Sequence, residues 1–501
     1  MPQSALTVAH QPPLFTSGPL IIGPKEFTEF RDLLTKINDL LLRSGCEGLF
    51  VERNLALMLE RKQSVRGEFA RLTAKEEQRY AKYAVLALRC NIAGYLTKLS
   101  TREFSIRLAE SEPLQRFCGI RELDRVVVPS KSRINNFRNQ FPEEMIRKVV
   151  NLLGLAAACE KNPLGLAEAT NRRNIWIDCT CLKANVHFPV DWVLLKDAVR
   201  TIAKSIATIR RHGLKHRMPT PESFLRTVNA IAMQMHHARG KLGAKKVRKR
   251  LFRKLKKVAK TVESHGQRYV ALLKDQWEIQ TDFTKAEAEF VITRIQNVLD
   301  QLPTAIEQAH RRIIQGKLVK NKDKILSLYD PSMGIIKRGK SNAEMEFGNE
   351  IYFAEQVDGL IVDWKLYAKQ PPAETTKTPE ILERLKRIVP DLSLICSDRG
   401  FYSAPNVALL EGEGVKSALC PRNPEEMRQA FQDDDFRRAQ KRRGSNEARM
   451  GIVKNVFVGN PVDSRVLKYK ECHLAWAILT HNLWVAAKLP RCSEMDQAQA
   501  A

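Results

Sequence analysis

The sequence predicts an α/β domain that is interrupted by a long helical insertion and preceded by an all-helical region. Three observations lead to this fold class. Apolar residues recur at spacings of three and four from residue 24 to about 154, as helices require. The β-branched and aromatic run Ile175-Trp176-Ile177 then predicts a buried strand. Helical periodicity returns over residues 193–324, and strands alternate with helices only after that segment.

These changes of period divide the chain into four parts. Residues 1–160 form the helical N-terminal region, 172–192 and 325–490 the α/β domain, 193–324 the insertion, and 491–501 a polar tail expected to be disordered. After its first strand, the α/β domain is expected to contain a helix at 379–388, an apolar C-terminal helix from about 471 to 489, and strands at 325–329, 350–353, 360–364, 392–396 and 415–419.

The composition favours a polyanionic partner. The 501 residues include 83 Lys and Arg against 56 Asp and Glu, a formal net charge of +27. An excess of this size favours nucleic acid, because each phosphate contact releases counterions. Apolar stretches are far shorter than the roughly 20 residues that cross a bilayer. The first residues also lack the pattern of an export signal. We therefore expect a cytoplasmic protein without membrane contact.

The cysteine pattern argues against structural zinc. Ten cysteines are scattered along the chain, and the only close pair in the sequence is Cys179 and Cys181. A C-x-C pair needs a second pair to complete a zinc site. In a reducing cytoplasm we expect free thiols and no disulfides.

A strongly basic amphipathic helix is predicted inside the insertion. Residues 239–260 contain twelve Lys or Arg and no acidic residue, interleaved with Leu251, Leu255 and Val258 at helical spacing. Most charge runs are solvated faces, and calmodulin-like partners or membrane surfaces attract similar patterns. Here a DNA contact is favoured, because a polyanion removes the repulsion among so many like charges. The contacts singled out are Lys245, Lys249, Arg253 and Lys256.

A second basic feature is a predicted helix start in the N-terminal region. Ser130 is placed to cap a helix whose first turn contains Lys131 and Arg133. Basic groups normally avoid a helix N-terminus, so this start suggests a helix end that meets phosphate, as in a helix-turn-helix protein. The alternative is an ordinary capped surface helix.

Three carboxylates lie at positions in the sequence that suggest a function for them. Asp178 lies inside the apolar first strand, where burial without a partner costs several kcal/mol. Asp398 directly follows the strand at 392–396, and active sites of α/β domains collect at such strand ends. Glu447 shares a predicted helical face with Arg443 and Lys454.

Each carboxylate also has an ordinary interpretation. Asp178 can be a bulge residue, Asp398 can belong to a common turn before Arg399-Gly400, and Glu447 can be part of a surface ion-pair ladder. The order of the three carboxylates along a basic chain favours a catalytic role over these alternatives. Two-metal phosphoryl transfer needs carboxylates from separate elements around two ions roughly 3.5 to 4 Å apart.

With these residues the chain resembles the DDE insertion-sequence transposases, which have a ribonuclease-H-like catalytic domain and a Y-x2-R-x3-E-x6-K signature. The similar segments span about residues 80–489 and are specific in combination. They are Trp176 to Asn185 around Asp178, Ser397 to Ser403 around Asp398, Arg443-x3-Glu447-x6-Lys454, the pairs Gly339-Lys340 and Phe347-Gly348, and the N-terminal segments starting at Ser100, Leu108 and Pro129. Gln440 stands where the signature has tyrosine, which puts one phosphate hydrogen bond in doubt.

The resemblance implies a ribonuclease-H-like fold for the α/β domain and a transposase activity. Two Mg²⁺ ions, for which Mn²⁺ usually substitutes, would be bound by Asp178, Asp398 and Glu447. Arg443 and Lys454 would hold DNA phosphates, with Lys340 and Arg399 as helpers.

The resemblance also implies partners. The helical N-terminal region would bind the terminal inverted repeats of a bacterial element, and two copies of the chain would bring both ends to the target DNA. A protein with these partners is expected in the bacterial cytoplasm, associated with the nucleoid. Two alternatives remain: a DNA-binding regulator derived from a transposase, against which the intact carboxylates argue, and a nuclease without strand transfer, against which the N-terminal region argues.

Overall fold

The computed structural model describes residues 22–122, 124–186, 190–238, 242–340 and 343–492. At 337–340 and 343–344 it describes the course of the backbone alone. The tail from residue 493 and the first residues of the chain, on which two of the expectations above fall, lie outside the described residues.

The N-terminal region is helical, as predicted, in the part that the structure describes. Two of its helices begin with a capping box, formed by Thr73 with Glu76 in one and by Ser100 with Glu103 in the other. The helices are α1 (Glu29–Ser44), α2 (Cys46–Arg66), α3 (Ala74–Thr97), α4 (Thr101–Glu110), α5 (Glu112–Cys118), α6 (Lys131–Gln140) and α7 (Glu143–Ala158), preceded by a short 3-10 turn at Lys25–Phe27.

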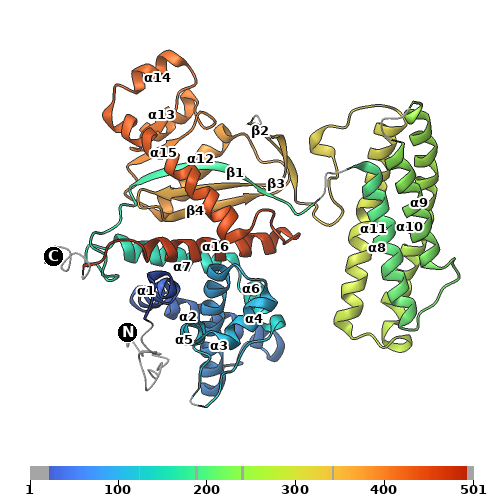
Figure 1. Cartoon of the computed structure of the whole chain (residues 1–501), viewed down its shortest axis with the longest axis horizontal. Helices are drawn as coiled ribbons and strands as arrows, with labels where there is room; N and C mark the ends of the chain where they lie inside the picture. The colour runs from blue at the N-terminus through green and yellow to red at the C-terminus, as the bar shows by residue number, and fades with distance from the viewer. Residues whose placement is uncertain (1–21, 123, 187–189, 239–241, 341–342, 493–501) are drawn as a thin grey trace.

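The insertion is also helical, as predicted. It consists of α8 (Asp191–Arg211), α9 (Pro221–His237), α10 (Ala244–Gln280) and α11 (Lys285–Ile313), which pack side by side as a bundle that projects from the rest of the molecule (Figure 1). The bundle has an apolar core of its own, in which Ile202, Leu255, Tyr269 and Ile295 are fully buried. It therefore stands as a separate packing unit.

The six strands of the described residues form one mixed sheet. They are β1 (Asn174–Lys183), β2 (Gly334–Lys340), β3 (Ala343–Gln356), β4 (Ile361–Tyr367), β5 (Leu394–Ser397) and β6 (Lys416–Leu419). The order is β2-β3-β1-β5-β6, with β4 paired to β3. Strand β1 runs antiparallel to β3 and parallel to β5, and β5 runs parallel to β6. The first strand is thus central, between the antiparallel and the parallel halves of the sheet.

The helices of the α/β domain follow the alternation expected after β4. They are α12 (Glu374–Ile388), α13 (Ala404–Gly412), α14 (Pro424–Ala430), α15 (Asp434–Ile452) and α16 (Leu467–Ala486), with a π-helical turn at Val453–Val458 after α15. Helix α12 begins five residues earlier than predicted, so Pro379 lies inside it. Helix α16 confirms the apolar C-terminal helix, since its side chains are buried around most of its girth.

The strand predicted at 325–329 is wrong. This segment follows a 3-10 turn and pairs with no strand. Side chains of α11 take the place of a neighbouring strand: Gln308 accepts a hydrogen bond from the Ile325 amide (2.7 Å) and donates one to its carbonyl (3.1 Å), and Gln301 donates to the Leu328 carbonyl (3.1 Å). The backbone hydrogen-bonding groups of this segment are therefore paired with glutamine side chains of the bundle instead of with another strand.

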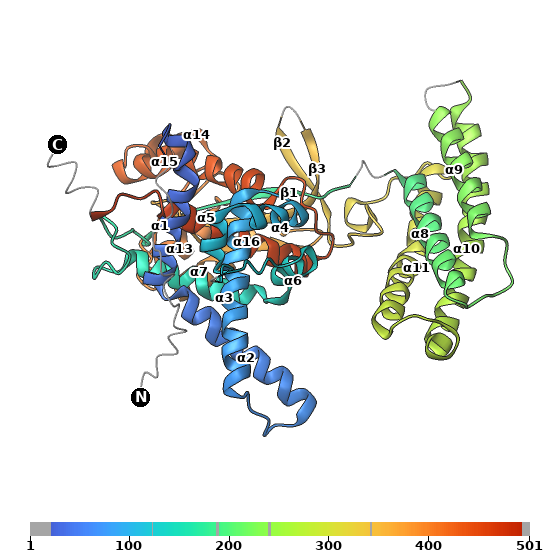
Figure 2. The same ribbon diagram turned by 60° about the horizontal axis from the view of Figure 1, so that its bottom comes forward.

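The N-terminal helices and the sheet share one apolar core. Helix α16 lies between them, with Trp476 packed against Phe50 and Phe141, and Leu360 and Trp364 of the sheet side belong to the same cluster (Figures 1 and 2). The boundary near residue 160 is a change of secondary structure without a break in packing.

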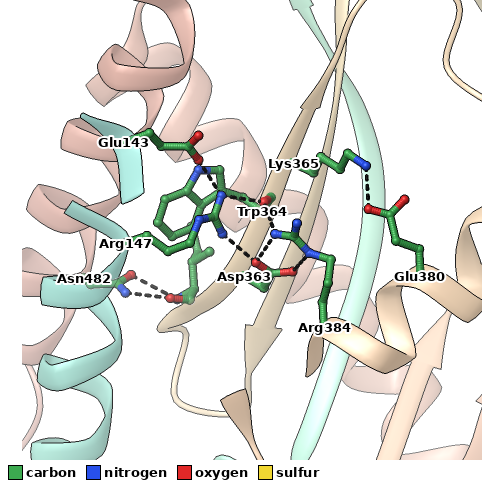
Figure 3. A network of polar contacts seen from close by, with 9 residues as sticks. Glu143, Arg147, Asp363, Trp364, Lys365, Glu380, Arg384 and Asn482 are labelled. Atoms are coloured by element: carbon green, nitrogen blue, oxygen red, sulfur yellow. Dashed lines mark hydrogen bonds and ion pairs between the residues drawn. The ribbon is translucent and has the colours of Figure 1, made fainter. Parts of the chain in front are cut away.

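A buried polar network reinforces this junction (Figure 3). Asp363 of β4 is fully buried and bonds to Arg147 of α7 (2.6 Å) and to Arg384 of α12 (2.6 and 2.8 Å). The Arg147 guanidinium also stacks on the Trp364 ring at 3.9 Å. A fully buried carboxylate is tolerated there because two guanidinium groups compensate its charge.

Candidate active site

Asp178 lies in the middle of β1, with 8 % of its surface exposed. Its Oδ1 accepts a hydrogen bond from the amide of Cys179 at 2.7 Å. The pKa of Asp178 is raised to about 7, first by burial and then by the negative charge of Asp398, with smaller contributions from Glu374 and Glu447. A carboxylate in this state lacks a compensating cation.

Asp398 stands beside Asp178 because of strand register. Trp176 of β1 is the register partner of Cys396 in the parallel strand β5, and each aspartate comes two residues later in its own segment. Asp398 begins the turn after β5, where its Oδ1 accepts a hydrogen bond from the Gly400 amide at 2.9 Å. The two aspartates predicted from the sequence are therefore neighbours at the carboxyl end of the parallel strands.

Glu447 is carried by α15, which is anchored on β1. The Trp176 indole donates to the carbonyl of Ala439 (2.9 Å), and Arg442 stacks over the Trp176 ring (4.3 Å). Glu447 itself is 59 % exposed and forms an ion pair with Arg443 at 3.1 Å. It faces the same cleft as Asp398, but its charge affects Asp178 less than the charge of Asp398 does.

Lys454 lies just past the end of α15, where the chain passes from α-helix to π-helix at Val453. The Lys454 amine donates to the Thr180 hydroxyl of β1 at 2.7 Å. In this arrangement Lys454 fastens the end of α15 to the central strand.

An open cleft of about 730 Å³ lies beside the carboxylates. Four cationic side chains line it together with the carboxylates of Asp398 and Glu447: they are Arg399, Arg437, Lys441 and Arg443. Arg437 and Lys441 were not singled out from the sequence, although Arg437 precedes Gln440 by three residues and Lys441 by four, the spacing of one helical face. The cleft can accept an anionic strand near the two aspartates.

Gln440, in the position of the signature tyrosine, also lines the cleft. Its amide donates to the carbonyls of Ser397 (3.0 Å) and Ala418 (2.7 Å), at the ends of β5 and β6. The amide of Gln440 thus joins two strands of the sheet.

The donor set suits a hard divalent cation. Asp178 and Asp398 offer carboxylate oxygens, and no cationic side chain of the described residues forms a salt bridge with the buried Asp178. Among the described residues, no three His, Cys, Asp or Glu side chains are gathered closely enough to hold one metal ion. Mg²⁺ is commonly bound through one or two carboxylates and keeps several waters. The aspartate pair fits such an ion, and Glu447 would have to turn from Arg443 to join it.

The other predicted DNA contacts lie on separate elements. Ser130 caps α6 by accepting from the Arg133 amide (3.4 Å), which confirms the helix start, and Lys131 and Arg133 are exposed. On α10, Lys245 and Arg253 are exposed and Lys249 and Lys256 half-buried. Lys340 lies in β2, and its side chain is outside the described residues.

Sequence reasoning missed one acidic residue close enough to affect Asp178, Glu374 at the start of α12. Among the acidic residues that affect Asp178, it ranks after Asp398 and before Glu447. No motif marks it, because its place depends on how α12 packs against the turn after β5.

None of the helices in the described parts of the chain is long and apolar enough to cross a membrane. Comparisons with known protein families, with curated proteins and with solved structures find no significant match. The interpretation of the site therefore depends on its own residues and geometry.

Proposed function

We propose that this chain is a DNA transposase of the insertion-sequence kind, which cleaves and joins DNA at a magnesium-dependent site formed by Asp178, Asp398 and Glu447. The observation that carries the proposal is the adjacency of Asp178 and Asp398 on neighbouring parallel strands, beside a cationic cleft. The resemblance of the flanking segments to the DDE transposases supports the same chemistry.

The bound magnesium would activate a water or a 3′-hydroxyl and stabilise the leaving 3′-oxygen. The residues of the chain have the tasks of binding and orienting DNA. Arg443 and Arg399 offer planar guanidinium groups that hold two oxygens of one phosphate. Trp176 and Arg442 hold α15 on β1, so that Glu447 stays within reach of the aspartates.

DNA is the proposed partner throughout. The exposed Lys131 and Arg133 at the start of α6 support end recognition, and the basic half of α10 supports contact with the DNA backbone. Joining two ends of one element requires two copies of the chain on the DNA, in a bacterial cytoplasm.

The test uses the full chain and duplex DNA carrying the genomic flanks of its reading frame. Asp178→Asn, Asp398→Asn and Glu447→Gln should each abolish Mg²⁺-dependent cleavage and leave binding of the same DNA intact, because a ligand charge is lost while remote contacts remain. Glu411→Gln on α13, an exposed acid away from the cleft, is the matched control. Robust cleavage by a carboxylate variant removes that residue from the site. Cleavage by the wild type without strand joining points to a nuclease.

A further inference from the structure

The carboxylate of Glu374 occupies the space that a side chain at Gly400 would need. A Cβ built on Gly400 would lie 1.6 Å from Glu374 Oε2 and 3.0 Å from Asp398 Oδ1. The two oxygens are therefore at most about 4.6 Å apart, the sum of these two distances. Glycine at position 400 thus allows an acidic side chain to reach the turn that carries Asp398.

A buried amide holds Glu374 and Gly400 together. Pro379 lacks an N–H, so the carbonyl of Thr375, four residues earlier in α12, has no helical donor. The side chain of Asn406 donates to that carbonyl (2.9 Å) and also to the carbonyl of Phe401 (2.9 Å). Since these residues directly follow Glu374 and Gly400, the amide links the start of α12 to the turn after β5.

A second buried contact fixes the same end of α12 on the sheet. Lys377 is almost fully buried, and its amine is bonded to Glu350 of β3 and lies 3.6 Å from Cys179 Sγ, next to Asp178 in β1. Lys377 follows Glu374 by about one helical turn. These two contacts, one with the turn after β5 and one with the sheet, therefore place the carboxylate of Glu374 near the two aspartates, although like charges repel.

An acidic residue in the first turn of a helix is ordinary, because it interacts favourably with the helix dipole. That role does not require the carboxylate to lie against Asp398 or position 400 to be glycine. We propose that Glu374 is a fourth acidic residue of the site, which helps Asp178 and Asp398 to bind the divalent cation through a bridging water. This inference rests on the proposed function.

The test measures Mn²⁺ binding by the full chain without DNA, by calorimetry. Glu374→Gln should weaken Mn²⁺ binding by roughly 10-fold or more, the range seen when residues that support metal ligands are changed. Glu383→Gln, an exposed acid further along α12, is the matched control and should bind as the wild type does.

Gly400 provides a second, independent variant. Gly400→Ala should weaken Mn²⁺ binding in the wild type, since the new methyl group displaces the flexible end of Glu374. In a Glu374→Ala background the same change should weaken Mn²⁺ binding much less, because only the contact of the new methyl group with Asp398 Oδ1, at 3.0 Å, remains. Circular dichroism would check that each variant is folded.

The outcomes separate this inference from the proposed function. If Glu374→Gln binds Mn²⁺ within about twofold of the wild type while Asp178→Asn loses binding, Glu374 has no part in the cation site. If Asp178→Asn and Asp398→Asn bind as the wild type does, or the wild type binds no Mn²⁺, the metal site itself is refuted and Glu374 with it.

Discussion

The charge of the insertion is concentrated at one end of the bundle. Residues 193–324 contain 30 Lys and Arg and 11 Asp and Glu, a net charge of +19 out of the +27 of the whole chain. Within α10, residues 244–262 contain ten basic residues and no acidic one, whereas residues 263–280 contain two basic and three acidic ones. Figures 1 and 2 show the basic half at the upper end of the molecule, where the β2–β3 hairpin also lies.

Replacing four cations of this half with glutamine tests whether they contact DNA phosphates. Lys245, Lys249, Arg253 and Lys256 span about 17 Å of helix axis, at 1.5 Å per residue. A duplex carries one charge per about 1.7 Å, so about ten phosphate charges lie within this span. Each lost contact should lower the slope of log affinity against log salt by about 0.9, and four contacts by about 3.6. When the salt concentration rises from 50 to 200 mM, the affinity of both proteins falls. The fold-loss of the variant should be about 150 times smaller than that of the wild type.

The assay is binding of fluorescent duplexes of specific and random sequence over a salt series. Both duplexes should respond alike, because phosphate contacts carry no sequence information. The control replaces four exposed cations of the other half of the bundle, Arg268, Lys274, Lys285 and Arg294, and changes the net charge equally. An unchanged slope for the α10 variant, or an equal change for the control, would refute a phosphate contact along the basic half.

Two further predictions concern the junction between the N-terminal helices and the sheet. Asp363→Asn should lower the free energy of unfolding by about 3 kcal/mol, since it leaves two guanidinium groups without their buried partner, and each is still about a quarter exposed. Urea unfolding measures this, and a loss below about 1 kcal/mol would contradict it. Burial lowers the pKa of His481 to about 3, so the folded chain binds fewer protons than the unfolded chain, whose histidine pKa is about 6.5. The contribution of neutral His481 to the free energy of unfolding is therefore present in full above pH 6.5. It falls by about 2 kcal/mol as the pH is lowered to 5. His481→Leu should remove that part of the pH dependence, and identical profiles would count against it.

The sequence by itself determined the secondary structure around the site. The run at Ile175 predicted a buried strand, the periodicity of residues 193–324 predicted helices, and Asp398 followed an apolar strand closely enough to lie at its carboxyl end. These features depend on neighbours along the chain, which a pattern of residues reports directly. The one strand predicted in error, at 325–329, failed because glutamine side chains of α11 satisfy its backbone instead of another strand.

Tertiary structure alone decided which carboxylates meet. The register of β1 against β5 places Asp178 beside Asp398, and no local pattern contains that register. Glu374 reaches them because Asn406 and the missing Cβ of Gly400 bring α12 to the turn after β5. Lys454 contacts Thr180 because the segment after α15 packs on β1. The physical reason is common to all three: strand register and helix docking are set by packing between segments distant in sequence, and the spacing of residue types within one segment carries no information about them.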